Sequence, residues 1–157
     1  MKAVYAGSFD PFTNGHLGIV REAAKFFDEV LVLCAVNPKK NPTFSRPGMV
    51  AAIGRCLRAQ GLSNARVISS DALTADVCAK YGAEYLVRGL RNTSDYLYEE
   101  EIAQFNQKIN PGLKTIYFRA VDAAISSTMV KELFSRGKDV SGYVPAEIAA
   151  ILEKEEL

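Results

Sequence analysis

Short apolar runs alternate with segments of helical periodicity along almost the whole chain. The clearest run, EVLVLCAV at residues 29–36, is nearly continuous in aliphatic and β-branched side chains. Such a run is typical of a strand that is buried on both faces of a parallel sheet. Residues 17–27 before it have apolar side chains at helical spacing, and the shorter run KAVYA at residues 2–6 ends at Gly7. The first part of the chain therefore predicts a strand, a helix and a second strand.

The same alternation continues toward the C-terminus. Ser45 and Pro47 have the chemistry of a helix start, and Gly61 lies near the end of that helix. Further strands are predicted at residues 65–69, 83–88 and 113–119, and further helices at residues 74–81 and 94–109. Because strict alternation implies βαβ crossovers, we predict an α/β fold: a doubly wound, Rossmann-like parallel sheet of five strands with helices on both faces. In such a sheet, ligands bind beyond the carboxyl ends of the strands.

Composition narrows the class of protein. The 157 residues suit one domain, 1–157, on which we expect a charged helical segment at about 143–157 to pack. With 19 basic against 18 acidic residues there is no overall positive field, so nucleic-acid binding is disfavoured and any anion site must be local. The longest apolar run, residues 30–36, is far too short to cross a membrane, and the start of the chain has no apolar signal region. We therefore expect a cytoplasmic protein.

The three cysteines, Cys34, Cys56 and Cys78, are odd in number and far apart in the sequence. This spacing gives neither a disulfide framework nor a CxxC metal motif. They are therefore predicted to be reduced residues of the core.

The stretch VYAGSFDPFTNGHLGIV, residues 4–20, places Gly7, Ser8 and the only histidine, His16, between a strand and a helix. A glycine after a strand lets the backbone approach a ligand closely, and a helix N-terminus offers free N–H groups to an anion. The stretch lacks both the GK[ST] ending of a P-loop and the GxGxxG of a dinucleotide fold. We predict that His16 donates a hydrogen bond to a phosphoryl oxygen; the alternative is that it only caps its own helix.

Further cations and hydroxyls follow other predicted strands. In RGLR, Arg88 and Arg91 stand at a strand end, where guanidinium groups grip phosphate in a fork; the alternative is that they pair with the nearby carboxylates Asp95, Glu99, Glu100 or Glu101. Lys39 and Lys40 lie on a loop that can bring a charge to a phosphate, although a solvated lysine pair is the more common case. The hydroxyls of ISST, residues 125–128, can cap a helix, contact phosphates, or both.

These groups share one predicted edge of the sheet and include no covalent nucleophile. The combination indicates phosphoryl or nucleotidyl transfer, in which a protein positions reactants and neutralises charge. Mg²⁺ would be held mainly by substrate phosphates, with no metal ligands from protein side chains.

The segment GSFDPFTNGH resembles the [ST]-F-D-P-x-[TH]-x-G-H signature of nucleotidyltransferases with an HxGH-type motif, with Thr13 at the first position of that motif and His16 at the last. RGLRNTSDYLYEEEIAQFN and ISSTMVKEL are similar to segments of the bacterial phosphopantetheine adenylyltransferases, and the resemblance extends to about Pro145. It implies reversible adenylyl transfer from ATP to 4′-phosphopantetheine, which gives dephospho-coenzyme A and pyrophosphate in the penultimate step of coenzyme A synthesis. The attack on the α-phosphorus would be in line and without a covalent intermediate. A homohexamer and feedback inhibition by coenzyme A are further implications.

The resemblance also implies individual roles. His16 would stabilise the transition state, with Lys40 and Arg91 as further catalytic residues. The implied ATP-binding residues are Ser8, Phe9, His16, Gly89, Leu90, Arg91, Glu99, Asp122, Ala123, Ala124, Ile125, Ser126, Ser127 and Thr128. The implied phosphopantetheine-binding residues are Ser8, Lys40, Leu73, Thr74 and Arg88. The chain departs from the family pattern at Gly18, at Leu97 and in lacking an aromatic residue before Ile125.

Three other functions stay open on the sequence alone. A sister enzyme that uses CTP or another phosphate acceptor shares the first motif. A non-catalytic nucleotide sensor would keep the fold and bind ATP without turnover. An oxidoreductase would use a similar sheet, but the missing GxGxxG disfavours it.

Overall fold

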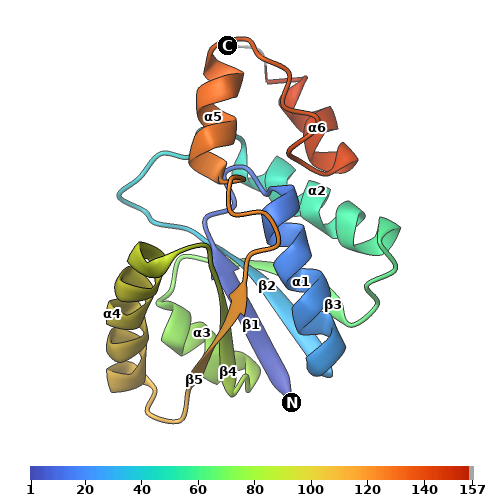
Figure 1. The fold of residues 1–157 in the computed structure, drawn as a ribbon. Coiled ribbons are helices and arrows are strands. Elements are labelled where there is room, and N and C mark those ends of the chain that lie inside the picture. Colours follow the sequence, from blue (N-terminus) through green and yellow to red (C-terminus); the bar gives the residue numbers. More distant parts are fainter. Residues whose placement is uncertain (156–157) are drawn as a thin grey trace.

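Five parallel strands form one sheet in the order β3-β2-β1-β4-β5 in the computed structural model, which describes residues 1–155 (Figure 1). The strands are β1 (Lys2–Gly7), β2 (Glu29–Ala35), β3 (Ala65–Ser70), β4 (Tyr85–Leu90) and β5 (Lys114–Arg119). The helices are α1 (Asn14–Phe26), α2 (Arg46–Ala59), α3 (Thr74–Tyr81), α4 (Thr93–Ile109), α5 (Ser127–Ser135) and α6 (Ala146–Leu152). The predicted doubly wound α/β fold is confirmed.

Two apolar clusters show how the strands are buried on both faces. In β1, Ala3 and Tyr5 face a cluster that includes the buried sides of α1 and α2. The alternate residues Val4 and Ala6 face a second cluster that includes α3, next to which α4 packs. Because successive side chains of a strand point to opposite faces, both faces need apolar residues, which explains the continuous run in β2.

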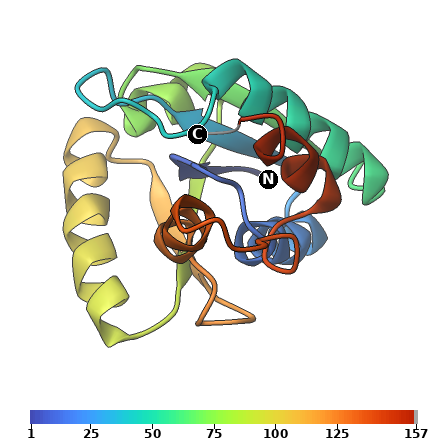
Figure 2. The ribbon, with the colours of Figure 1, turned by 90° about the horizontal axis from the view of Figure 1, so that it is seen from above.

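The strand order places a topological switch point between β1 and β4. Tyr5 of β1 is in register with Val32 of β2 on one side and with Val87 of β4 on the other. The chain leaves β1 through α1 on one face of the sheet, and it enters and leaves β4 through α3 and α4 on the other. A crevice opens at the carboxyl ends of such strands. Figure 2 looks down on this end of the molecule, with α5 and α6 nearest the viewer.

Three element boundaries bear on the site. Helix α1 begins at Asn14, three residues before the predicted start, because Thr13 caps it and so extends the helix by a turn. Strand β4 continues to Leu90, two residues beyond the predicted end, because its pairing with β5 runs that far. Helix α5 begins as expected, with the Ser126 side chain accepting a hydrogen bond from the Met129 N–H.

The C-terminal helix α6 lies against α2. Its residues Ile148 and Leu152 are buried, and the Ser45 N–H at the start of α2 donates to the Glu155 carboxylate. The final two positions of the predicted tail, 156–157, lie outside the described residues. In residues 1–155, no helix combines the length and apolar character needed to cross a membrane.

The thiols of Cys34, Cys56 and Cys78 are free and buried. Burial raises their pKa values to about 12, 11 and 11 respectively, so almost no thiolate exists at neutral pH. We predict that the folded protein resists a thiol reagent at pH 8 and that all three thiols react after unfolding in guanidinium. Rapid labelling of the native protein would contradict this placement.

Candidate active site

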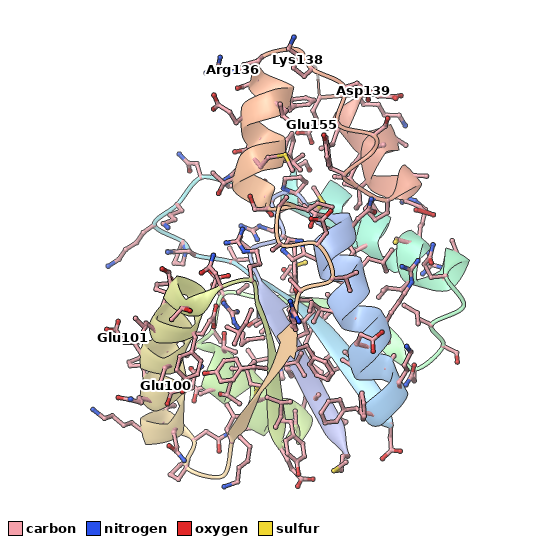
Figure 3. All side chains as sticks on the ribbon, in the orientation of Figure 1. Glu100, Glu101, Arg136, Lys138, Asp139 and Glu155 are labelled. Atoms are coloured by element: carbon pink, nitrogen blue, oxygen red, sulfur yellow. The ribbon has the colours of Figure 1, made fainter. Side chains whose placement is uncertain are left out.

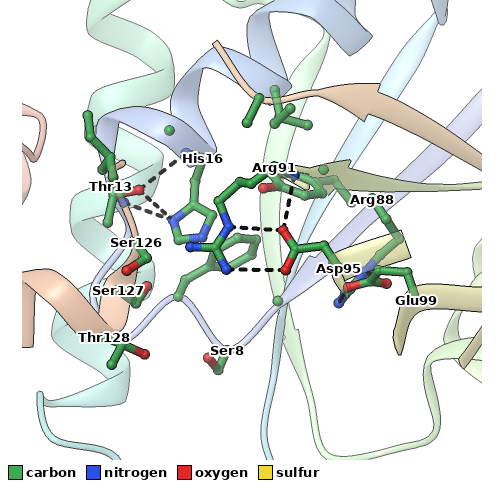
Figure 4. Close-up of a pocket in the computed structure, with 18 of the residues that line it drawn as sticks. Ser8, Thr13, His16, Arg88, Arg91, Asp95, Glu99, Ser126, Ser127 and Thr128 are labelled. Atoms are coloured by element: carbon green, nitrogen blue, oxygen red, sulfur yellow. Dashed lines mark hydrogen bonds and ion pairs between the residues drawn. The ribbon is translucent and has the colours of Figure 1, made fainter. Parts of the chain in front are cut away.

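A cavity of about 470 Å³ lies at the carboxyl ends of β1 and β4 (Figure 4). Its walls come from the loop after β1, the start of α1, the end of β4, the first turns of α4 and the segment from β5 into α5. The lining residues are Tyr5, Ala6, Gly7, Ser8, Phe9, Thr13, Gly15, His16, Ile19, Arg88, Gly89, Arg91, Asp95, Tyr98, Glu99, Ala120, Asp122, Ile125, Ser126, Ser127 and Thr128. Segments far apart in the sequence therefore meet at the switch point, as the strand order requires.

The turn after β1 has an unusual conformation. Phe9 has a φ of 46°, which non-glycine residues rarely adopt, and its side chain is 2% exposed. Its ring lies over Gly7, where an added Cβ would come within 2.8 Å of the ring. Glycine is therefore required at position 7 by this close approach. Asp10 fixes the same turn by accepting hydrogen bonds from the Thr43 and Phe44 N–H groups, at 2.8 and 3.0 Å.

His16 is the N3 residue of α1 and forms a reciprocal capping box with Thr13. The Thr13 Oγ1 accepts from the His16 N–H at 3.3 Å, while the Thr13 N–H donates to the imidazole Nδ1 at 2.9 Å. Because a backbone N–H can only donate, Nδ1 is the unprotonated nitrogen and the ring proton is on Nε2. The structure thus shows the helix cap, which uses Nδ1 and does not involve the Nε2–H. Donation from Nε2–H to a phosphoryl oxygen is compatible with this cap and stays a prediction.

Aromatic rings surround the imidazole of His16. Phe12 stacks on it with ring centroids 5.5 Å apart, and Phe9 meets it edge-on at 5.0 Å. Burial, together with the charges of Arg88 and Arg91, lowers the pKa of His16 to about 4. His16 is therefore a neutral hydrogen-bond donor at neutral pH.

We predict that His16 titrates near pH 4 in the unliganded protein instead of at its ordinary pKa of 6.5. Because the pKa is lower in the folded state, the unfolded chain binds the proton more tightly. The stability from this group is present above about pH 6.5 and is lost as the pH falls toward 4. A proton NMR titration measures this directly, since the chain has one histidine. A midpoint near 6.5 would contradict the buried, neutral ring.

Arg88 lies at the end of β4 and is held on several sides. Its Nε and Nη2 donate to the two carboxylate oxygens of Glu99, both at 2.7 Å, and its Nη1 donates to the Ala6 carbonyl at 2.6 Å. Burial acts to lower the pKa of Arg88, but the bonds and the charge of Glu99 outweigh burial and raise it. The guanidinium is therefore a permanent cation that stays fixed at the wall of the cavity.

Arg91 forms a second, more exposed pair. Its Nε donates to Asp95 Oδ2 at 3.0 Å and its Nη2 to Oδ1 at 3.4 Å, while its backbone N–H donates to Oδ2 at 3.0 Å. Burial acts to raise the pKa of Asp95. The hydrogen bonds and the charge of Arg91 together outweigh burial, so the pKa of Asp95 lies below its ordinary value. Figure 4 draws the Arg91 guanidinium between His16 and Asp95. Both arginines thus pair with carboxylates of α4 and also line the cavity.

The N-terminus of α5 closes another side of the cavity. Ser126 caps the helix, and the Ser127 hydroxyl donates to the Pro11 carbonyl at 2.8 Å. This second bond ties α5 to the turn after β1. Backbone N–H groups in the first turn of a helix have no intrahelical partner, so those of α5 can donate to an anion in the cavity.

The structure brings together twelve of the predicted site residues: Ser8, Phe9, His16, Arg88, Gly89, Arg91, Glu99, Asp122, Ile125, Ser126, Ser127 and Thr128 line the cavity. Six others, Lys40, Leu73, Thr74, Leu90, Ala123 and Ala124, are not among its lining residues. Lys40 is exposed on the loop after β2, and Leu73 is 51% exposed before α3.

The sequence did not point to several lining residues, including Tyr5, Ile19 and Tyr98. Arg46 was also missed; its Nη1 lies 3.2 Å from the carbonyls of both Ser8 and Ala35, so it braces the turn after β1. The sequence does hold one signal for the acids that pair with the arginines: Asp95 and Glu99 are four residues apart, so in a helix they lie on one face.

Within residues 1–155, no group of three or more His, Cys, Asp or Glu side chains is placed to hold a metal ion. Two carboxylates of the cavity, Asp95 and Glu99, are engaged by arginines. The Asp122 carboxylate accepts a hydrogen bond from the Ala124 N–H at 3.0 Å. The donors of this cavity suit phosphate oxygens, and a cation that phosphates carry in is compatible with them.

The fold and the matching family define the class of protein. The sequence model of the cytidylyltransferase-like family matches residues 4–133, which places the chain among the nucleotidyltransferases of that kind. A proposed nicotinate-nucleotide adenylyltransferase from Vibrio parahaemolyticus has the same fold, with a TM-score of 0.74 at 18% identity over 98% of this chain and 92% of that one.

Closer relatives identify the particular family. The phosphopantetheine adenylyltransferase of Limosilactobacillus reuteri (strain DSM 20016) is 41% identical over 97% of this chain and 88% of its own length. That of Heliobacterium modesticaldum is 43% identical over 97% of this chain and 91% of its own length. The chain belongs to the phosphopantetheine adenylyltransferase family, as the motif resemblance predicted.

Proposed function

We propose that this protein transfers the adenylyl group of ATP to 4′-phosphopantetheine and releases dephospho-coenzyme A and pyrophosphate. Membership of the family supports the choice of substrates. The observation that carries the chemistry is the neutral imidazole of His16, which has its Nδ1 committed to Thr13 and its Nε2–H left free at the cavity. This group can donate to a phosphoryl oxygen without itself losing a proton.

The reaction proceeds by direct displacement. A phosphate oxygen of phosphopantetheine attacks the α-phosphorus of ATP in line; a new P–O bond forms as the bond to the β-phosphate oxygen breaks, and pyrophosphate leaves with that electron pair. His16 stabilises the charge on the α-phosphoryl oxygens in the transition state.

The remaining residues bind the two substrates. Arg91 and the first turn of α5 bind the ATP phosphates, while Arg88 and Ser8 face the attacking phosphate. Lys40, which is exposed on the loop after β2, is a further cation for the attacking phosphate. Leu73 and Thr74 bind the pantetheine arm where it extends beyond the cavity. Mg²⁺ carried in by the phosphates of ATP would supply further neutralisation of charge.

The proposal extends to assembly, regulation and location. Helix α4 exposes a set of large apolar side chains, which favours burial against other copies in a homohexamer. They are Tyr96, Leu97, Tyr98, Phe105 and Ile109. Coenzyme A, which contains the product, is the proposed feedback inhibitor, and the enzyme is proposed to act in the cytoplasm. Light scattering of the purified protein tests the assembly, since a monomer at micromolar concentration would oppose it.

The function itself is tested by pyrophosphate release with Mg²⁺, 4′-phosphopantetheine and either ATP or CTP, with the organic product identified by mass. Turnover with ATP that forms dephospho-coenzyme A is expected. Turnover with CTP alone would indicate a sister enzyme with the same fold. Binding of ATP without any turnover, by folded protein, would instead favour a nucleotide sensor.

A further inference from the structure

We infer that Asp95 and Glu99, two carboxylates on one face of α4, are positioning residues that orient Arg91 and Arg88 toward the substrate phosphates. The inference rests on the proposed function, because it takes the ligands of the two arginines to be the substrates of that reaction. For Glu99 it adds the orientation of Arg88 to the nucleotide contact that the motif resemblance implies. The residue would act through Arg88.

The two ion pairs share one geometry. In both, the carboxylate engages the guanidinium edge formed by Nε and Nη2, with distances of 2.7 Å in the Arg88 pair and 3.0 and 3.4 Å in the Arg91 pair. A guanidinium has a second edge, formed by Nη1 and Nη2, which can also grip an anion in a fork. Each acid therefore fixes the plane of its arginine while part of the opposite edge stays available.

Arg88 shows how much freedom this arrangement removes. Of its five N–H donors, two are used by Glu99 and one by the Ala6 carbonyl, which leaves two. The Glu99 side chain is 9% exposed and has both oxygens bonded to Arg88. A carboxylate held in this way fixes the plane of the Arg88 guanidinium through two bonds.

The charges that line the cavity also support the view that the acids orient the arginines. Its lining includes two cations, Arg88 and Arg91, and three carboxylates, Asp95, Glu99 and Asp122. Acidic groups beside an anion site weaken its attraction for phosphate. Their presence is therefore explained better by the direction in which they hold the guanidinium groups than by any contribution to binding of their own.

Helix α4 is itself firmly placed, which a positioning element requires. The Asn92 side chain accepts from the Asp95 N–H at 2.9 Å and so fixes the first turn. The Tyr117 hydroxyl of β5 donates to Glu100 at 3.0 Å. Helix α4 also packs against β4, the strand at whose end the two arginines lie.

A rival explanation is that both pairs only stabilise the fold, since a partly buried arginine needs a counter-charge. The two explanations differ in kinetics. A structural pair would affect the folded fraction and not the KM of the folded enzyme. A positioning pair changes the KM of one substrate in folded protein, and its effect disappears once the arginine is removed.

The test is a double-mutant cycle in the full-length protein. Glu99→Gln is expected to raise the KM of the substrate that Arg88→Gln also affects, by roughly 10- to 100-fold, with the Arg88→Gln/Glu99→Gln variant no worse than Arg88→Gln alone. Asp95→Asn is expected to act in the same way through Arg91, with a smaller effect because that pair is more exposed. Glu99→Asp, which keeps the charge, is expected to restore part of the loss.

Glu101→Gln is the matched control, because Glu101 is on the same helix but exposed, and Figure 3 shows it directed away from the sheet. It should leave both KM values unchanged. Additive losses in the double variants would overturn the inference, as would a lower melting temperature with unchanged KM values. If Glu99→Gln does not fold, the Asp95 and Arg91 cycle decides in the same way.

Calorimetric titration with ATP and with 4′-phosphopantetheine separates this inference from the proposed function. Weaker binding in the acid variants, non-additive with the arginine variants, would support the inference even if the wild-type protein showed no turnover. The absence of turnover by itself would overturn only the proposed function.

Discussion

His16→Ala is expected to lower kcat by roughly 100- to 1000-fold while the KM values for ATP and 4′-phosphopantetheine change little. In the proposed reaction the imidazole donates from Nε2 to an oxygen whose negative charge grows only as the reaction proceeds, so we expect its loss to raise mainly the free energy of the transition state. Steady-state kinetics with pyrophosphate detection, together with calorimetric binding of each substrate, measure the two effects separately.

His16→Gln is a useful companion because it keeps an N–H donor on a side chain of similar reach. It should recover part of the lost rate if a neutral donor is what the reaction needs. Equal losses of binding and rate in His16→Ala would make His16 a structural cap of α1, since this variant removes the bond from the Thr13 N–H to Nδ1, whereas a Gln at this position can still accept that bond. A chemical denaturation curve for each variant shows how much of any loss is due to unfolding.

Phe12→Ala is expected to lower the free energy of unfolding by about 3–5 kcal/mol. The Phe12 side chain has no exposed surface, packs edge-on against Phe9 at 5.3 Å and stacks on His16. Its removal leaves a cavity beside the imidazole of His16. Guanidinium denaturation measures the loss, and the NMR titration of His16 should move upward toward 6.5 as water reaches the ring.

Phe26→Ala makes the same chemical change at the last residue of α1, where the ring is 65% exposed. It contacts Phe118 at 5.9 Å, so its loss is expected to cost under about 1 kcal/mol. Similar costs for the two variants would contradict the view that the site is supported by a buried aromatic cluster. An unchanged His16 titration in Phe12→Ala would show that Phe12 does not shield the imidazole.

Periodicity and turn chemistry predicted most of the fold because they report local physics. The apolar run that became β2 is buried on both faces, and Ser126 caps α5 as its position before that helix indicated. The start of α1 was predicted too late, since Asn14, Gly15 and His16 are not apolar and their helical turn depends on the Thr13 cap. The extension of β4 through Gly89 depends on its pairing with β5, which periodicity does not report.

For the candidate site too, residue types predict some features and not others. The motif around His16 and the two arginines after β4 could be identified from residue types, because phosphate chemistry needs a donor and cations near a helix N-terminus. The partners of those groups could not. Residue types alone allow Arg88 and Arg91 either to serve a ligand or to pair with acids. The structure shows that they pair with Glu99 and Asp95 and still line the cavity.

The sequence alone thus determined the order of the elements, the family and the residues able to do the chemistry, because these follow from local patterns and from motifs. Only the tertiary structure decided the protonation and the orientation of those residues. The proton of His16 is on Nε2 because Thr13 donates to Nδ1, and its pKa is low because Phe9 and Phe12 bury the ring near two arginines. Protonation and orientation are set by neighbours brought together from distant strands, and no spacing along the chain reports that approach.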